Sequence, residues 1–227
     1  MISEVKNMDC MDYMRQFPDK FFDLAVVDPP YGINMDGGVI GISKKAANRQ
    51  YTKKAWDADA PDKSYFEELQ RVSKNQIIFG ANHFISRIPL DSSCWIVWNK
   101  ENGNNPFADC ELAWTSFKTA VRMFTFRWQG MLQGNMKHKE DRIHPTQTPV
   151  ALYAWIFKNF ARGGQKILDT HLGSGSSRIA AWKMGLDFYG CELDKEYFEN
   201  MDARFQQECN GIEVVNNVVI QQTSLFG

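Results

Sequence analysis

The sequence lacks any metal-binding or redox pattern of cysteines. The five cysteines, Cys10, Cys94, Cys110, Cys191 and Cys209, are scattered, and no two of them form a C-x-x-C pair. This spacing argues against a disulfide framework and against a structural zinc site, and it fits a reducing compartment. We therefore expect a cytoplasmic protein that holds no metal ion.

Long apolar runs are also lacking. No stretch approaches the roughly 18 apolar residues of a membrane span, and the opening MISEVKNMDC has no apolar core of the kind found in signal peptides. The sequence thus predicts neither membrane insertion nor export. Its 227 residues, 44% hydrophobic and 23% charged, suit one globular domain, and we expect residues 1–227 to form it.

A net charge of one sign is absent too, since the formal charge is −1 at pH 7. The distribution is nevertheless uneven: residues 41–56 carry five bases and no acid, residues 117–142 are also basic, and residues 186–202 are acidic. Basic surface of this kind favours a polyanion, although ordinary solvated loops are the alternative interpretation. The side chains that we expect to contact nucleic acid are Lys44, Lys45, Arg49, Lys53, Lys54, Arg127 and Trp128.

Apolar strands alternate with amphipathic helices along the chain. Strand patterns are expected up to about Asp9 and over residues 21–28, 75–82, 93–100, 110–117, 121–128, 166–169 and 187–194. Helical patterns occupy residues 10–17, 62–73, 145–164, 176–184 and 195–209, whereas residues 32–59 are polar and without pattern. The alternation predicts an α/β fold with a doubly wound, mostly parallel sheet.

The segment VVDPPYGINMDGG, residues 26–38, marks the end of one expected strand. Pro29 cannot donate a ladder hydrogen bond and restricts the residue before it, so the strand must stop at Asp28. Asp28 is therefore predicted at the carboxyl tip of a strand, with Pro30 in a rigid turn and Tyr31 projecting from it. In open α/β sheets, ligands bind at this edge.

A second segment, ILDTHLGSGSSRIAA, places Gly173 and Gly175 between a strand and a helix. The glycines permit a tight turn and a close ligand, and the helix start offers unpaired N–H groups to an anion. Glu192, nineteen positions after Gly173, ends the next strand and is placed to accept hydrogen bonds from ribose hydroxyls. Arg178 replaces the third glycine of a dinucleotide fingerprint, and no phosphate-binding P-loop motif is present. An adenosine compound with an anionic tail is predicted, the alternative being a plain helix-capping turn.

With DPPY ahead of the glycine loop, the sequence resembles the S-adenosylmethionine-dependent DNA amino-methyltransferases in their β arrangement. The resemblance extends over nearly the whole chain, through NMDCMDYM, WNKENGNNPFADCELAWTS and RIHPTQTPVALYAWI. Two departures stand out. The family commonly reads Asp-Pro-Phe-x-Gly-Ser-Gly where this chain has DTHLGSG, and Thr148 replaces a lysine in its His-Pro-Thr-Gln-Lys-Pro segment.

The resemblance implies a class I methyltransferase, Rossmann-like in fold, that uses S-adenosylmethionine. In this family Asp28 and the Pro29 carbonyl would accept hydrogen bonds from the target amine, while Tyr31 stacks on a base flipped out of the duplex. The catalytic set is then Asp28, Pro29, Pro30 and Tyr31. The cofactor set implied is Asp9, Cys10, Thr146, Asp169, His171, Gly173, Ser174, Gly175, Ser176, Glu192 and Leu193.

The resemblance also implies double-stranded DNA as partner, a homodimer, and a prokaryotic or phage-encoded restriction-modification setting. We expect a mobile basic loop over residues 32–58 and a short target-recognition region over residues 118–142. DPPY favours N6 of adenine; N4 of cytosine, a catalytically idle DNA-binding module and a methylase of protein glutamine remain alternatives. His171 is expected to contact the cofactor or pack rather than act as a base, and His144 to be structural.

Overall fold

A computed structural model of the protein describes residues 1–35, 38–40, 49–51, 54–88, 90–103, 107–129, 132–137, 139–215 and 218–221. Of residues 38–40, 49–51, 212–215 and 218–221, only the backbone is described. Within this part of the chain, no helix is both long enough and apolar enough to cross a membrane.

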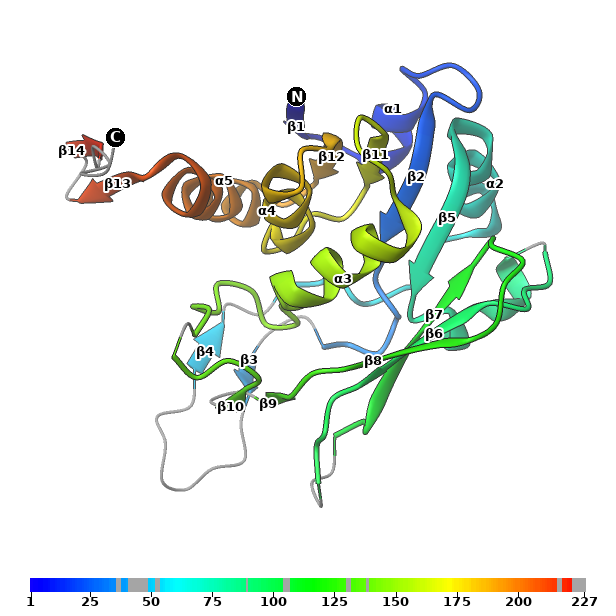
Figure 1. Cartoon of the computed structure of the whole chain (residues 1–227), viewed down its shortest axis with the longest axis horizontal. Helices are drawn as coiled ribbons and strands as arrows, with labels where there is room; N and C mark the ends of the chain where they lie inside the picture. Colours follow the sequence, from blue (N-terminus) through cyan, green and yellow to red (C-terminus); the bar gives the residue numbers. More distant parts are fainter. Residues whose placement is uncertain are drawn as a thin grey trace.

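Eight of the described strands form one sheet (Figure 1). From edge to edge they are β1 (Ser3–Asn7), β12 (Asp187–Glu192), β11 (Lys166–Asp169), β2 (Phe22–Val27), β5 (Ser73–Phe79), β7 (Cys110–Thr115), β6 (Trp95–Asn99) and β8 (Arg122–Thr125). β7 runs antiparallel to both of its neighbours, and the other strands share one direction. The mostly parallel sheet that the alternating pattern predicts is confirmed.

Helices cover both faces of this sheet (Figure 1). On one face lie α3 (Val150–Phe160), α4 (Ser176–Lys183) and α5 (Lys195–Asn210); on the other lie α1 (Cys10–Met14), α2 (Lys63–Val72) and the short 3₁₀ turns η1 (Ala81–His83) and η2 (Ile85–Arg87). The sheet is therefore doubly wound, as expected for a Rossmann-like methyltransferase.

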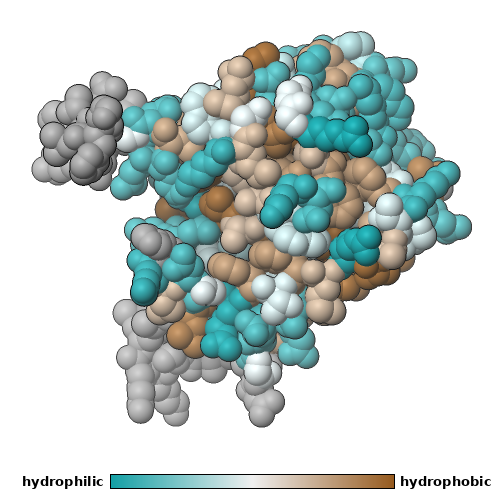
Figure 2. All heavy atoms as spheres, in the orientation of Figure 1, coloured by the Kyte–Doolittle hydropathy of each residue, from teal (hydrophilic) through white to brown (hydrophobic). Residues whose placement is uncertain are grey.

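Two apolar cores follow from the alternation of side chains along each strand. In β2, Leu24 and Val26 join the core beneath α3 and α4, whereas Ala25 and Val27 join the core beneath α2. Because both faces are buried, the strand reads as the continuous apolar run LAVV rather than as alternating polar and apolar residues. Figure 2 shows apolar side chains gathered over α3 on the face in view.

Several element boundaries differ from those expected. β5 begins at Ser73, directly after α2, because no turn residue separates the two patterns. α3 spans only part of the helical pattern, since the prolines before Val150 delay its start and it ends at Phe160. Asp62 occupies the N-cap position of α2 but makes no capping hydrogen bond.

Among the described strands, three short antiparallel pairs lie outside the main sheet. They are β3 (Gly38–Ile40) with β4 (Arg49–Tyr51), β9 (Trp128–Gln129) with β10 (Leu132–Gln133), and β13 (Ile212–Val215) with β14 (Val218–Gln221). The first corrects the expectation that residues 32–59 are without regular structure, because valine, isoleucine and tyrosine in its two strands favour extended backbone.

Candidate active site

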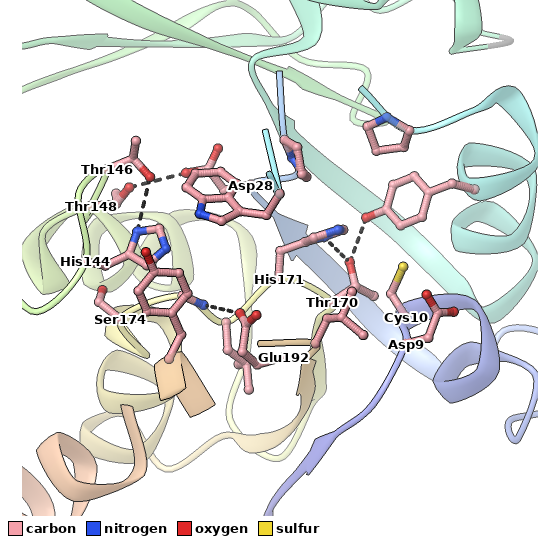
Figure 3. Close-up of a pocket in the computed structure, with 18 of the residues that line it drawn as sticks. Asp9, Cys10, Asp28, His144, Thr146, Thr148, Thr170, His171, Ser174 and Glu192 are labelled. Carbon is pink, nitrogen blue, oxygen red and sulfur yellow. Dashed lines mark hydrogen bonds between the residues drawn. The ribbon is translucent and has the colours of Figure 1, made fainter. Parts of the chain in front are cut away.

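A cavity of about 390 Å³ lies beyond the carboxyl ends of β1, β12, β11 and β2 (Figure 3). Its size suits a small-molecule ligand, and its place at the strand ends is where α/β sheets bind ligands. Asp28 stands at one end and Asp9 at the other, with His171 and Glu192 between them.

Asp28 follows the last residue of β2 and points into this cavity. Tyr31 Oη donates a hydrogen bond of 2.6 Å to Asp28 Oδ1, and Thr148 Oγ1 donates a long one of 3.4 Å to Oδ2. Burial raises the pKa of the Asp28 carboxyl to about 7, and the nearby negative charge of Glu111 adds to the increase. Asp28 can therefore change its charge near neutral pH.

Tyr31 is held from several sides. Its ring stacks on His83 with centroids 5.0 Å apart. Gly80, at φ +64°, lies against the same ring, and a Cβ there would come within 2.0 Å of Tyr31 Cε1, so only glycine fits. The backbone N–H of Tyr31 donates to Asp57 Oδ1 at 2.7 Å. Asp57 also accepts from the N–H groups of Gly32 and Met35, which fixes the turn after DPPY.

A half-buried ion pair lies near Asp28. Lys100, just after β6, pairs with Glu111 on β7, and its ammonium sits 4.7 Å from the centre of the Trp98 ring. Glu111 raises the pKa of Asp28, whereas Lys100 lowers it. The sequence predicted only that Lys100 and Glu111 belong to strands. Their approach to Asp28 could not be predicted, because Asp28 lies more than 70 positions earlier in the chain.

The glycine loop joins β11 to α4. Gly173 (φ +48°) and Gly175 (φ +74°) have left-handed backbone, and a Cβ on Gly175 would come within 2.4 Å of Met201 Cγ. Asp169 shapes the loop from within: it accepts from the backbone N–H of His171 at 3.0 Å and from the Ser177 hydroxyl at 2.6 Å. Burial raises the pKa of Asp169 to about 7.

Glu192 closes the loop from the end of β12. Its Oε2 accepts from the N–H of Gly173 and its Oε1 from the N–H of Asp194, both at 2.9 Å. Burial raises the pKa of this carboxyl above its usual range. Each oxygen keeps a lone pair for a ligand hydroxyl.

Asp9 is the N-cap of α1. Its Oδ1 accepts from the N–H groups of Met11 and Asp12 at 2.8 and 3.2 Å. The adjoining Cys10 also lines the cavity, and burial raises the pKa of its thiol to about 12, so it is a neutral apolar contact. These residues can enclose a flat base such as adenine.

Both histidines of the cavity wall are neutral at pH 7. Burial lowers the pKa of His171 to about 4 and that of His144 to about 3. His171 shares a hydrogen bond of 3.0 Å with the Thr170 hydroxyl. His144 packs edge-on against Tyr197 with ring centroids 4.3 Å apart. His144 also lines the cavity, which its position before Pro145 did not reveal.

The structure brings most of the expected site residues together. Those that line the cavity are Asp9, Cys10, Asp28, Pro30, Thr146, His171, Gly173, Ser174, Ser176, Glu192 and Leu193. Pro29, Tyr31, Asp169 and Gly175 are not among the lining residues, and Asp169 and Gly175 shape the loop from behind, which corrects their expected cofactor contacts. Sequence reasoning missed further wall residues: Met8, Trp56, Tyr65, Thr148, Tyr153 and Tyr197.

The residues expected to contact nucleic acid lie in different environments. Trp128 is 7% exposed, and its indole N–H donates to the Gln147 carbonyl at 2.6 Å, so it is a core residue rather than an exposed contact. The ammonium of Lys54 pairs with Asp194 and Glu196 at 2.7 and 2.9 Å. Arg127 is exposed. Lys44, Lys45 and Lys53 lie outside the described residues, and for Arg49 only the backbone is described.

Among the described side chains, no group of three or more histidine, cysteine, aspartate or glutamate residues is placed to hold a metal ion.

Comparison with known proteins gives consistent relatives. A family profile for N6/N4 enzymes, described as DNA methylase, matches residues 97–203. The type II methyltransferase M.HinfI of Haemophilus influenzae is 22% identical, over 88% of this chain and 67% of its own length. The type II methyltransferase M2.MboI of Moraxella bovis is 21% identical, over 88% of this chain and 86% of its own length.

Solved structures share the fold. The crystal structure of the M1.HpyAVI–SAM complex matches with a TM-score of 0.57 and 20% identity, covering 90% of this chain and 98% of that one. The PvuII DNA methyltransferase (cytosine-N4-specific) matches with a TM-score of 0.56 and 11% identity, covering 96% of each chain. The chain is therefore similar in sequence to the N6/N4 DNA methylases over residues 97–203 and to type II methyltransferases over most of its length, and it shares the fold of the solved structures.

Proposed function

We propose that this chain transfers the methyl group of S-adenosylmethionine to an exocyclic amino group of a base in double-stranded DNA, with N6 of adenine as the target. The observation that carries the proposal is that one cavity holds both Glu192, suited to a ribose, and Asp28, suited to an amine. A cofactor bound along this cavity would bring its reactive end toward the DPPY motif. The S-adenosylmethionine complex of the related M1.HpyAVI supports this choice of cofactor.

The residues present fit such a cofactor. Glu192 offers two carboxylate oxygens at the strand tip for the ribose hydroxyls, and Asp9 with Cys10 borders a space for the adenine. The start of α4 presents Ser174 and Ser176 to an anionic tail. When bound, S-adenosylmethionine supplies a methyl group that is activated by its attachment to a sulfonium.

Asp28 makes the target amine a nucleophile. The lone pair of an exocyclic amine is delocalised into the base, so the nitrogen must move from planar toward tetrahedral before it can attack. Asp28 and the Pro29 carbonyl would each accept one N–H, and these hydrogen bonds strengthen as positive charge develops on the nitrogen. The nitrogen then bonds to the methyl carbon, the carbon–sulfur bond breaks with its electron pair on sulfur, and one amine proton leaves.

The departing proton has an acceptor in place. A carboxyl whose pKa is about 7 can take the proton from the methylated amine and release it to water at neutral pH. No stronger base is required, because the amine becomes acidic only as the methyl group arrives. Tyr31 keeps Asp28 oriented through its hydroxyl, and the same residue is proposed to stack on the flipped base.

Cytosine N4 is the second candidate target, because the same two acceptors would serve either amine. The fold match to the cytosine-N4-specific PvuII enzyme favours keeping this alternative, whereas Asp28 in place of serine favours adenine. A catalytically idle DNA-binding module is the candidate from another class.

The deciding experiment incubates the full chain with unmethylated plasmid DNA and labelled S-adenosylmethionine, then digests the DNA and identifies the modified nucleoside. We expect N6-methyladenine, lost in Asp28→Ala while cofactor binding persists. N4-methylcytosine would move the assignment to cytosine. Cofactor binding or DNA binding without any labelled nucleoside would contradict the proposed transfer.

A further inference from the structure

Arg204 on α5 is buried behind the glycine loop, with 7% of its surface exposed. One of its terminal nitrogens, Nη1, donates to the Ser174 carbonyl and to the Ser176 hydroxyl, both at 3.0 Å. The other, Nη2, donates to Glu140 Oε2 at 2.8 Å, and Nε donates to Glu208 Oε1 at 2.9 Å. The Arg204 guanidinium thus connects α5 with two segments far away in the sequence, the glycine loop and Glu140.

These contacts fix the part of the loop that faces the cavity. Ser174 and Ser176 both line the cavity, and Arg204 approaches them from the opposite side. The Ser174 carbonyl, which would repel an anionic ligand, is directed to a cation outside the lining. Lysine could not reproduce this set of bonds, because its ammonium is a single point and the guanidinium is a planar fork with five donors.

Glu140 extends the network to the region before α3. Its Oε1 accepts from the backbone N–H of Val150 at 3.0 Å, at the start of that helix. The Gln133 side chain, on β10, bonds both ways with the backbone of Glu140, at 2.8 Å in each direction. Gln133 and Glu140 belong to the region 118–142 that we expect to recognise the target.

We propose that Arg204 is a positioning residue for the cofactor loop, and that Glu140 links this loop through Arg204 to the target-recognition region, so that cofactor and DNA strengthen each other's binding. The second part rests on the proposed function, and the first does not. Linkage of this kind is reciprocal: any factor by which DNA raises cofactor affinity is also the factor by which cofactor raises DNA affinity.

The first arm of the test measures S-adenosylmethionine binding to the full chain by calorimetry, without DNA. We expect Arg204→Lys to weaken binding about tenfold or more, as for the loss of charge-assisted hydrogen bonds. Arg178→Lys is the matched control, because Arg178 is 5% exposed and bonds to Ser3 and Asp202 instead. It should change the affinity by less than about twofold.

A milder variant keeps this test informative if Arg204→Lys fails to fold. Ser176→Ala removes one hydrogen bond of Arg204, the bond between the Ser174 and Ser176 hydroxyls, and one hydroxyl that faces the cavity, and it should weaken cofactor binding by at least about threefold. Circular dichroism and the thermal midpoint report whether each variant folds. Equal affinities for Arg204→Lys and Arg178→Lys, with both variants folded, would overturn the positioning role, as would an unchanged affinity in Ser176→Ala.

The second arm repeats the titration with saturating unmethylated plasmid DNA. The wild-type chain should bind the cofactor more tightly with DNA than without it, and Glu140→Gln should lose this gain while its affinity without DNA falls by less than about threefold. If DNA raised the cofactor affinity of Glu140→Gln as much as that of the wild type, or did not raise that of the wild type, the coupling through Glu140 would be contradicted. A chain that binds cofactor but never methylates DNA would refute the proposed function and leave the first arm intact.

Discussion

Two carboxylates, Glu192 beside the expected cofactor and Asp28 beside the expected target base, line one cavity and are held in different ways. Both oxygens of Glu192 accept backbone N–H groups, from Gly173 and Asp194. The oxygens of Asp28 accept hydroxyl groups of side chains, from Tyr31 and Thr148. Backbone donors are fixed by the fold, whereas hydroxyl groups can rotate away. The cofactor end is therefore rigid, and the target end can exchange partners with an incoming amine.

The same contrast separates two kinds of chemistry. Glu192 needs only to accept hydrogen bonds from the ribose of the cofactor, which is not altered by methyl transfer. Asp28 must respond to charge that appears during the reaction, and burial together with Glu111 brings its pKa to about 7. Substitutions at the target end should therefore change the reaction rate, and substitutions at the cofactor end should change affinity.

The largest effect is expected for Asp28→Ala. Removing one of two acceptors that act in the transition state should lower kcat by about 10²–10³-fold, by analogy with the loss of one oxyanion-hole donor. The cofactor Kd should stay within about threefold of wild type, because Glu192 is untouched. Single-turnover methylation and calorimetry measure the two quantities. A large loss of cofactor affinity would abolish the distinction between the two ends.

The reverse result is expected for Glu192→Gln. An amide places a donor where Glu192 now accepts from Gly173 or Asp194, so one backbone N–H loses its partner. We expect the Kd for S-adenosylmethionine to rise about 10- to 100-fold, with kcat at saturating cofactor lowered by less than about threefold. A fall in kcat without a change in Kd would contradict the role of Glu192 in cofactor affinity.

The pH dependence sharpens the comparison further. Activity requires ionised Asp28, so the rate should fall as the pH drops through about 7. Glu111→Gln removes a charge that raises the pKa of Asp28 and should shift this midpoint to lower pH. Tyr31→Phe removes a hydrogen bond that lowers that pKa and should shift the midpoint to higher pH. Midpoints that move together, or not at all, would contradict the role of Asp28.

A smaller effect concerns stability. The folded Asp28 has a pKa above its unfolded value of 3.8, so the native state binds more protons between about pH 4 and 7 and loses stability as the pH rises through that window. Asp28→Asn removes the ionisation. Its thermal midpoint at pH 8 should exceed that of the wild type by about 5 °C, with a smaller difference at pH 4. Equal thermal midpoints of the wild type and Asp28→Asn at both pH values would show that ionised, buried Asp28 does not lower the stability of the folded state.

Local signals account for what could be predicted from the sequence. The apolar run ending in Asp28-Pro29 marks a strand tip, and Gly173 with Gly175 marks a turn, because proline and glycine constrain the backbone wherever they occur. The alternation of strand and helix patterns predicted the doubly wound sheet, and the two motifs with Glu192 predicted a ligand site at the carboxyl ends of its strands. The family profile matches residues 97–203, which include the glycine loop and Glu192.

Contacts between distant segments could not be predicted. Asp57 stabilises the turn after DPPY from a polar stretch that carries no pattern, and Glu111 approaches Asp28 only because β7 runs past the end of β5. Trp128, flanked by Arg127 and Gln129, has the sequence context of an exposed residue. It is buried because its N–H finds the Gln147 carbonyl.

The most direct test of the account is a crystal structure of the full chain with S-adenosylmethionine bound. We predict that the ribose hydroxyls bond to Glu192 and that the sulfonium methyl faces Asp28, with space for one amino nitrogen about 3–3.5 Å from the methyl carbon. A cofactor bound outside this cavity, or with its methyl group turned away from Asp28, would contradict the account.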